Sequence, residues 1–168
     1  MRCGCDLRRE RCRTQIERPH AQAQQGQTLE GRWDRSKYSG VELMDKTLGI
    51  LGFGRIGQLV AQRAQGFGMR VLAYDPFVGA EKYRDLGVEK ADSSEDVYAQ
   101  ADFITVHLPK TKETLGLIGV DALSKVKPTV HIVNAARGGI VDEVALADAI
   151  REGRVAGAGI DVFVKEPC

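Results

Sequence analysis

Short apolar runs alternate with stretches of helical spacing along most of the chain. Runs typical of buried strands occupy residues 48–51, 70–74, 101–107, 129–134 and 155–162, with a brief strand near Val88. Helices are expected over 58–66, 80–86, 120–126 and 141–152, and Ser93 followed by acids predicts the start of another. Because strands and helices alternate, the pattern predicts an α/β fold with an open, doubly wound parallel sheet of Rossmann-like type.

The first apolar run ends in the glycine pattern Gly52-x-Gly54-x-x-Gly57. Gly52 permits the sharp bend from strand to helix, Gly54 lets a pyrophosphate approach the backbone, and Gly57 lets the helix pack closely on the strand. The free N–H groups at the helix start, around Arg55 and Ile56, would then face the phosphates. The pattern and its place between a strand and a helix predict a dinucleotide site.

The second apolar run is followed by Asp75, eighteen residues after Gly57. Its carboxylate can accept hydrogen bonds from both hydroxyls of an adenosine ribose. Its charge would repel a 2′-phosphate, which favours NAD over NADP. A glycine-rich turn in another kind of α/β protein is the alternative interpretation. Strand, helix, second strand and acid in the expected order favour the dinucleotide site.

Small residues and a guanidinium follow the strand expected at 129–134, at the sheet edge where open α/β sheets bind ligands. Ala135 and Ala136 would let a flat ring lie close. Arg137 offers a fork of donors to a substrate carboxylate or carbonyl. In isolation Arg137 would be read as a surface salt-bridge residue, but its place at the carboxyl end of a strand favours a role in the site.

Acidic residues near the end of the chain have less specific interpretations. Asp161 closes the last strand, which we expect to be buried, so its carboxylate needs a partner such as a nicotinamide carboxamide. Asp142 and Glu143 are expected as acids in the first turn of a helix. Glu166 would be an exposed acid with no assigned role.

The composition is that of an ordinary globular protein. The 168 residues are 43% hydrophobic and carry a net charge of +1, which gives no electrostatic case for binding nucleic acid or a membrane surface. No apolar run approaches the roughly eighteen residues of a membrane span, and the N-terminus lacks the apolar core of a signal peptide. A cytoplasmic location is therefore expected.

Residues 1–27 differ from the rest. They hold six arginines, five glutamines and three of the four cysteines, with few large apolar residues. Such a segment buries too little surface to offset the entropy of ordering. We expect a disordered or non-native leader at 1–27 and an NAD-binding domain over 28–168. The cysteine spacing matches no usual zinc motif, so no metal site is expected.

Five segments together resemble one family. They are 31–38 (GRWDRSKY), 47–57 (TLGILGFGRIG), 102–111 (DFITVHLPKT), 134–143 (NAARGGIVDE) and 157–167 (GAGIDVFVKEP). The chain resembles the cofactor-binding domain of the D-isomer-specific 2-hydroxyacid dehydrogenases from about residue 29 to its last residue. The positions that would bind NAD are Gly52, Gly54, Arg55, Ile56 and Gly57 at the pyrophosphate, Asp75 at the ribose, Leu108 and Pro109 on the adenosine side, and Ala135, Ala136 and Asp161 at the nicotinamide.

The resemblance also implies a reaction. Arg137 would orient the carboxylate and carbonyl of a 2-hydroxy acid, favoured here to be a phosphorylated one, and Glu166 would pair with a catalytic histidine and raise its basicity. In the family that histidine lies beyond Glu166, and neither His107 nor His131 is a candidate for it. We therefore expect a fragment that lacks the histidine and most of the substrate domain, with little activity by itself, and pairing into a homodimer.

Three other readings stay open. The chain would share nearly all these motifs with family members that act on glyoxylate, hydroxypyruvate or D-lactate. It would share them with non-catalytic modules that bind NAD(H). A truncated product that binds NAD weakly is the third reading.

Overall fold

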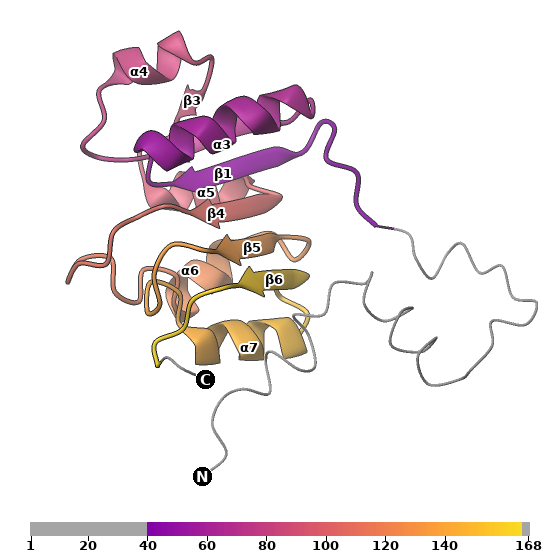
Figure 1. Ribbon diagram of the computed structural model, residues 1–168. Coiled ribbons are helices and arrows are strands. Elements are labelled where there is room, and N and C mark those ends of the chain that lie inside the picture. Colours follow the sequence, from indigo (N-terminus) through magenta and orange to yellow (C-terminus); the bar gives the residue numbers. More distant parts are fainter. Residues whose placement is uncertain (1–39, 166–168) are drawn as a thin grey trace, which may run out of the picture. The chain divides into compact units, whose positions relative to one another are not determined.

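Strand β1 (Thr47–Leu51) is buried at all five positions and pairs with a strand on each side. In the computed structural model, which describes residues 40–165, it belongs to a six-stranded sheet of order β3-β2-β1-β4-β5-β6. The other strands are β2 (Arg70–Tyr74), β3 (Glu89–Lys90), β4 (Phe103–Val106), β5 (His131–Asn134) and β6 (Gly157–Ile160). Every pairing is parallel, so the expected doubly wound sheet is confirmed (Figure 1).

Helices cover the sheet on two sides. They are α3 (Arg55–Gly66), α4 (Ala80–Asp85), α5 (Ser94–Gln100), α6 (Val120–Lys125) and α7 (Glu143–Arg151). Ile50 and Val71 enter a core closed by α3 and α4, whereas their neighbours Leu51 and Leu72 enter a larger core closed by α5, α6 and α7. Burial on both faces explains why the central strands are continuously apolar instead of alternating with polar residues.

Some element boundaries differ from those expected. α3 begins three residues before its expected start, because the end of the glycine pattern forms its first turn. β3 begins just after Val88, which is itself a core residue. α7 starts later than expected, since Val141 pairs with Ile118 in an isolated parallel bridge and Asp142 caps the helix.

The expectation that the last strand is buried is wrong. β6 lies at the edge of the sheet and pairs only with β5, and its residues range from half-buried to exposed. Asp161, the residue after β6, is exposed as well. Its carboxylate therefore carries no burial cost, and the argument from desolvation that it needs a partner does not hold.

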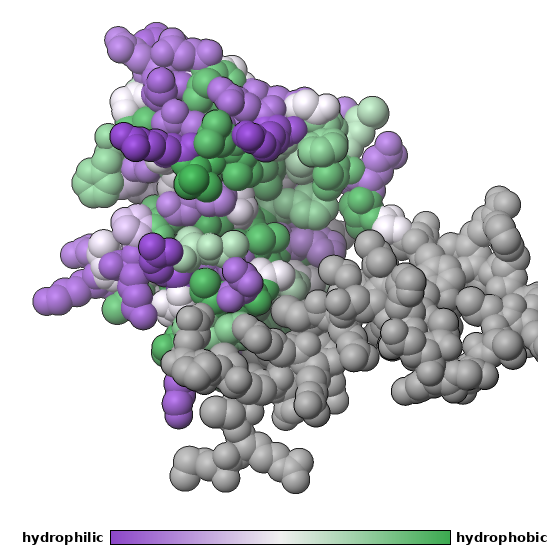
Figure 2. All heavy atoms as spheres, in the orientation of Figure 1, coloured by the Kyte–Doolittle hydropathy of each residue, from purple (hydrophilic) through white to green (hydrophobic). Residues whose placement is uncertain are grey.

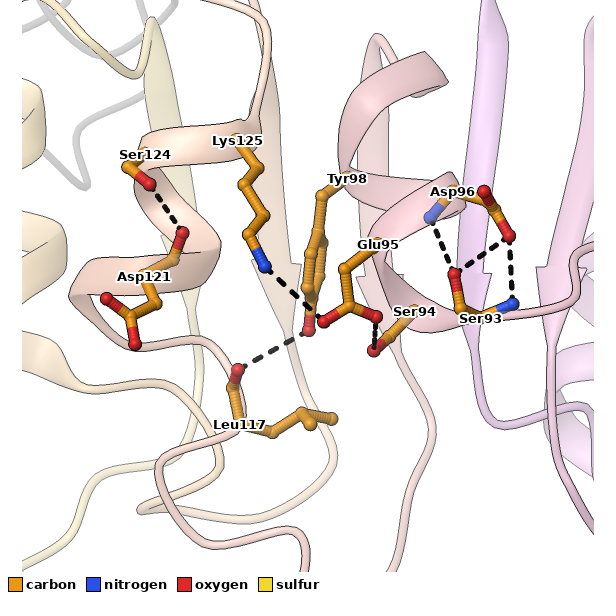
Figure 3. Close-up of polar contacts among 9 residues, drawn as sticks. All are labelled: Ser93, Ser94, Glu95, Asp96, Tyr98, Leu117, Asp121, Ser124 and Lys125. Carbon is orange, nitrogen blue, oxygen red and sulfur yellow. Dashed lines mark hydrogen bonds and ion pairs between the residues drawn. The ribbon is translucent and has the colours of Figure 1, made fainter.

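α5 begins with the capping expected from Ser93 and the acids that follow it. The Ser93 hydroxyl oxygen accepts a hydrogen bond from the Asp96 N–H, and the Asp96 carboxylate accepts from the Ser93 N–H and hydroxyl (Figure 3). Lys125 of α6 pairs with Glu95 at 3.5 Å. The reciprocal cap fixes the start of α5, whereas the exposed ion pair adds little.

The chain divides into two units, Met1–Glu42 and Leu43–Cys168, and the sheet belongs to the second. The expected leader at 1–27 and the boundary after it lie outside the described residues. Leu43 packs against the α3 core, whereas Val41 is exposed. None of the helices in the described part of the chain has the length and apolar character needed to cross a membrane.

Asp102 links β1, β4 and β5 at the amino ends of these strands, opposite the glycine turn. Its carboxylate accepts a hydrogen bond from the Thr47 N–H at 2.8 Å and pairs with Lys127 at 2.9 Å. Its backbone carbonyl accepts from the His131 N–H of β5 at 3.0 Å. Partial burial alone would raise the pKa of Asp102, but the Thr47 N–H and the Lys127 ammonium outweigh it and hold that pKa below its usual range.

Replacing Asp102 should destabilise the fold. Asp102→Ala leaves the Thr47 N–H without its acceptor and should cost about 1–3 kcal/mol in free energy of unfolding. Because the folded-state pKa of Asp102 lies below the unfolded one, its contribution is present above about pH 4 and is lost as the pH falls through the folded-state pKa. Urea unfolding at pH 7 and pH 3 measures both effects. Asp92→Asn, at an exposed aspartate, is the control, and equal loss in the two variants would contradict the assignment.

Candidate cofactor and substrate site

Each glycine of the turn after β1 meets a different constraint. Gly52 has a φ of 95°, and a Cβ there would come within 2.8 Å of the His107 backbone. A Cβ on Gly57 would overlap the Gly52 carbonyl. At Gly54, in contrast, a Cβ would meet no described atom within 4 Å. The fold itself requires the first and third glycines, whereas Gly54 borders open space that a ligand can enter.

The start of α3 is open to an anion. Among the helices of residues 40–165, α3 alone begins with neither a side-chain cap nor an acid in its first turn. The first residues, Arg55 and Ile56, are exposed, and the Gln58 N–H is the first to bond back, to the Gly54 carbonyl at 3.0 Å. The earlier N–H groups lack intrahelical acceptors and carry the positive end of the helix dipole, which suits a phosphate.

Asp75 is oriented by the two loops beside it. One carboxylate oxygen accepts a hydrogen bond from the Phe53 N–H of the glycine turn, and the other accepts from the Phe77 N–H, both at 2.9 Å. The Tyr83 ring stacks on Phe53 with centroids 4.4 Å apart, and its hydroxyl donates to the Asp75 carbonyl at 3.3 Å. Burial, and then the charge of Asp75, raise the pKa of Tyr83 to about 12, so its hydroxyl remains a donor.

The loop after β5 is organised by Asn134, a residue to which the sequence pattern assigns no role. Asn134 is only 1% exposed. The side-chain oxygen of Asn134 accepts from the Ala136 N–H at 3.1 Å, and its amide nitrogen donates to the Arg137 carbonyl at 3.1 Å. Ala135 and Arg137 are exposed on this loop, and Ala136 is half-buried. A buried amide at the end of an apolar strand, followed by small residues, is the signal that could have identified it.

The turn after β4 lies beside the glycine turn, since the His107 backbone faces Gly52. Leu108 is half-buried against the larger core and Pro109 is exposed. The His107 ring nitrogen Nε2 lies 3.1 Å from the Thr105 hydroxyl oxygen. Burial lowers the pKa of His107 and so favours the neutral imidazole.

The predicted positions therefore lie at the carboxyl ends of neighbouring strands, along one edge of the sheet. The glycine turn bonds to Asp75, and the Asp161 N–H donates to the Asn134 carbonyl at 3.0 Å. Glu166 lies outside the described residues. Within those residues, no group of three or more His, Cys, Asp or Glu side chains is placed to hold a metal ion.

Comparison with known proteins identifies the family. A sequence model of the NAD-binding domain of D-isomer specific 2-hydroxyacid dehydrogenases matches residues 13–168. The chain belongs to this family. It is 60% identical over 136 residues to a D-3-phosphoglycerate dehydrogenase of Mycobacterium leprae, a match that covers 81% of this chain and 26% of the relative. The chain thus spans about a quarter of the length of the curated relatives it matches.

Solved structures of the family share the fold. A glyoxylate reductase from Paecilomyes thermophila matches with a TM-score of 0.79 at 35% identity, covering 92% of this chain and 45% of that one. A D-lactate dehydrogenase with NAD+ from Lactobacillus jensenii matches with a TM-score of 0.76 at 32% identity, covering 92% and 45%. The chain therefore carries an NAD-binding domain of the dehydrogenase family, and open space at Gly54 beside an uncapped helix fits that cofactor.

Proposed function

We propose that this chain is the cofactor-binding part of an NAD-dependent dehydrogenase acting on a 2-hydroxy acid. The observation that carries the proposal is the open space at Gly54, next to the uncapped start of α3 and within one hydrogen-bonded turn of Asp75. A turn that only joins a strand to a helix has no use for open space, an uncapped helix start and a neighbouring carboxylate together. A dinucleotide with two phosphates and a ribose diol would use each of them.

The proposed cofactor site follows the sheet edge. Gly52, Gly54, Arg55, Ile56 and Gly57 would hold the pyrophosphate through the helix start. Each oxygen of the Asp75 carboxylate already accepts one backbone N–H, and it keeps further lone pairs for ribose hydroxyls.

The nicotinamide half of the site would lie at the ends of β5 and β6, beyond β4. The turn formed by Leu108 and Pro109 would border the adenosine side. Ala135 and Ala136 would flank the nicotinamide ring, and Asp161 would accept from its carboxamide. The exposure of Asp161 agrees with a carboxylate kept at the edge of a ligand site, because an exposed carboxylate pays no burial cost before the ligand binds.

Arg137 is the residue we assign to the substrate. It is exposed, and the bonds of Asn134 fix the loop that carries it. Its planar guanidinium would hold the carboxylate and the carbonyl oxygen of the substrate. Bound NAD supplies the hydride acceptor. Glu166 would raise the basicity of a histidine that takes the hydroxyl proton during oxidation.

The substrate we propose for the whole protein is 3-phosphoglycerate, oxidised to 3-phosphohydroxypyruvate on the way to serine. The support is the 60% identity to relatives named D-3-phosphoglycerate dehydrogenase. Glyoxylate, hydroxypyruvate and D-lactate are the alternatives. Solved structures named as a glyoxylate reductase and as D-lactate dehydrogenases, at 32–35% identity, support glyoxylate and D-lactate. A homodimer and a cytoplasmic location belong to the same proposal.

The cofactor site is tested by titrating NADH with the chain and following the fluorescence of NADH. Gly54→Ala should weaken NADH binding about tenfold or more, because the added methyl group occupies the space of the pyrophosphate while the fold tolerates it. Asp75→Asn should weaken NADH binding similarly, because the ribose hydroxyls lose a charged acceptor. It should also reduce the ratio of NADH to NADPH affinity, because the charge that repels the 2′-phosphate is gone. Gly66→Ala is the matched control, on the same helix and also next to open space. Binding unchanged in the Gly54 and Asp75 variants would contradict the site.

The substrate assignment is tested on the NADH-loaded chain with 2-oxo acids. Arg137→Ala should weaken 3-phosphohydroxypyruvate binding about tenfold or more and leave NADH affinity unchanged, because only the substrate carboxylate loses its partner. Arg154→Ala, at an arginine paired with Glu152 away from the site, is the control. Tighter binding of glyoxylate or pyruvate than of the phosphorylated acid would contradict the proposed substrate.

A further inference from the structure

The segment after β6 crosses to the start of α7 and is bonded there. The Val164 N–H donates to the Glu143 carboxylate at 2.6 Å, across 21 residues of sequence. Glu143 is the first residue of α7, where the sequence pattern predicts only a charge that stabilises the helix. The contact is therefore a specific link between two separate parts of the site edge.

Capping does not explain this carboxylate. The start of α7 is already capped by Asp142, whose side chain accepts from the Val144 and Ala145 N–H groups at 3.0 Å. Glu143 is thus not needed to satisfy the first turn. Its oxygen instead satisfies a backbone N–H that lies outside the helix.

A second contact fixes the same segment. A Cβ at Gly138 would overlap the Phe163 carbonyl, so the backbone at Phe163 passes directly over the loop that carries Arg137. Phe163 is only 8% exposed. At the other end of the segment, the Asp161 N–H donates to the Asn134 carbonyl. Residues 161–164 are therefore held at three points, against β5, the Arg137 loop and α7.

We infer that Glu143 is a positioning residue for the nicotinamide end of the site. By holding the Val164 N–H it fixes the short segment 161–164, which begins with Asp161. The inference rests on the proposed function, in which Asp161 binds the nicotinamide carboxamide. It predicts that loss of the Glu143 carboxylate affects the nicotinamide half of the cofactor and not the adenosine half, which Asp75 and the α3 start hold more than one strand away.

The test compares NADH with ADP-ribose, which lacks the nicotinamide, on the full chain. Glu143→Ala should weaken NADH binding about tenfold and ADP-ribose binding less than twofold. Glu143→Gln should restore most of the NADH affinity, because its amide oxygen can still accept from Val164. Glu152→Ala, at the other end of α7, is the matched control. Amide hydrogen exchange at Val164 should become at least about tenfold faster in Glu143→Ala only.

The other possible outcomes contradict the role of Glu143, the role of Asp161 or the proposed function. Equal weakening of NADH and ADP-ribose by Glu143→Ala would assign Glu143 a role in general stability and overturn the inference. Unchanged NADH binding, or unchanged exchange at Val164, would overturn it as well. A wild-type chain that binds ADP-ribose and NADH equally would overturn the role proposed for Asp161, and one that binds neither would overturn the proposed function itself.

Discussion

The site depends on the place of β1 between β2 and β4. The strands that follow β1 in the sequence, β2 and β3, lie on one side of it, and β4, β5 and β6 lie on the other. The turn after β1 therefore lies where the strand order reverses. Ligands bind at such a point in open parallel sheets. Because β1 is buried at every position and bonded on both edges, the glycine turn that follows it starts from a fixed backbone.

Asp75 serves the fold before any ligand arrives. Its two bonds to backbone N–H groups join the glycine turn to the turn after β2, and its remaining lone pairs point to a binding role. Asn134, on the other side of β1, has a similar role in the fold. Its side chain bonds the backbone of Ala136 and Arg137 and so fixes the loop that carries Arg137. Figure 2 shows hydrophobic residues reaching the surface around α3. Ile56 and Leu59 of this helix are exposed.

The fold could be predicted from sequence because its strands are short apolar runs and its turns carry specific residues. Ser93 and the glycines of the turn after β1 each specify local geometry. The exposure of β6 and Asp161 could not be predicted, because an edge position follows from the order in which distant strands pair. The contacts of Asn134 and Glu143 could not be predicted for the same reason: a polar residue at the end of a helix or strand has many possible local partners, and the folded neighbours determine which one it bonds.

We propose that NAD lies along the carboxyl ends of β1, β2 and β5. The most direct measurement is the change in backbone amide chemical shifts when NADH is added to the isotope-labelled chain. The largest changes should fall at 53–57, at 75–77 and at 134–137. Changes concentrated instead at the capped start of α5, or no changes at high NADH concentration, would contradict it.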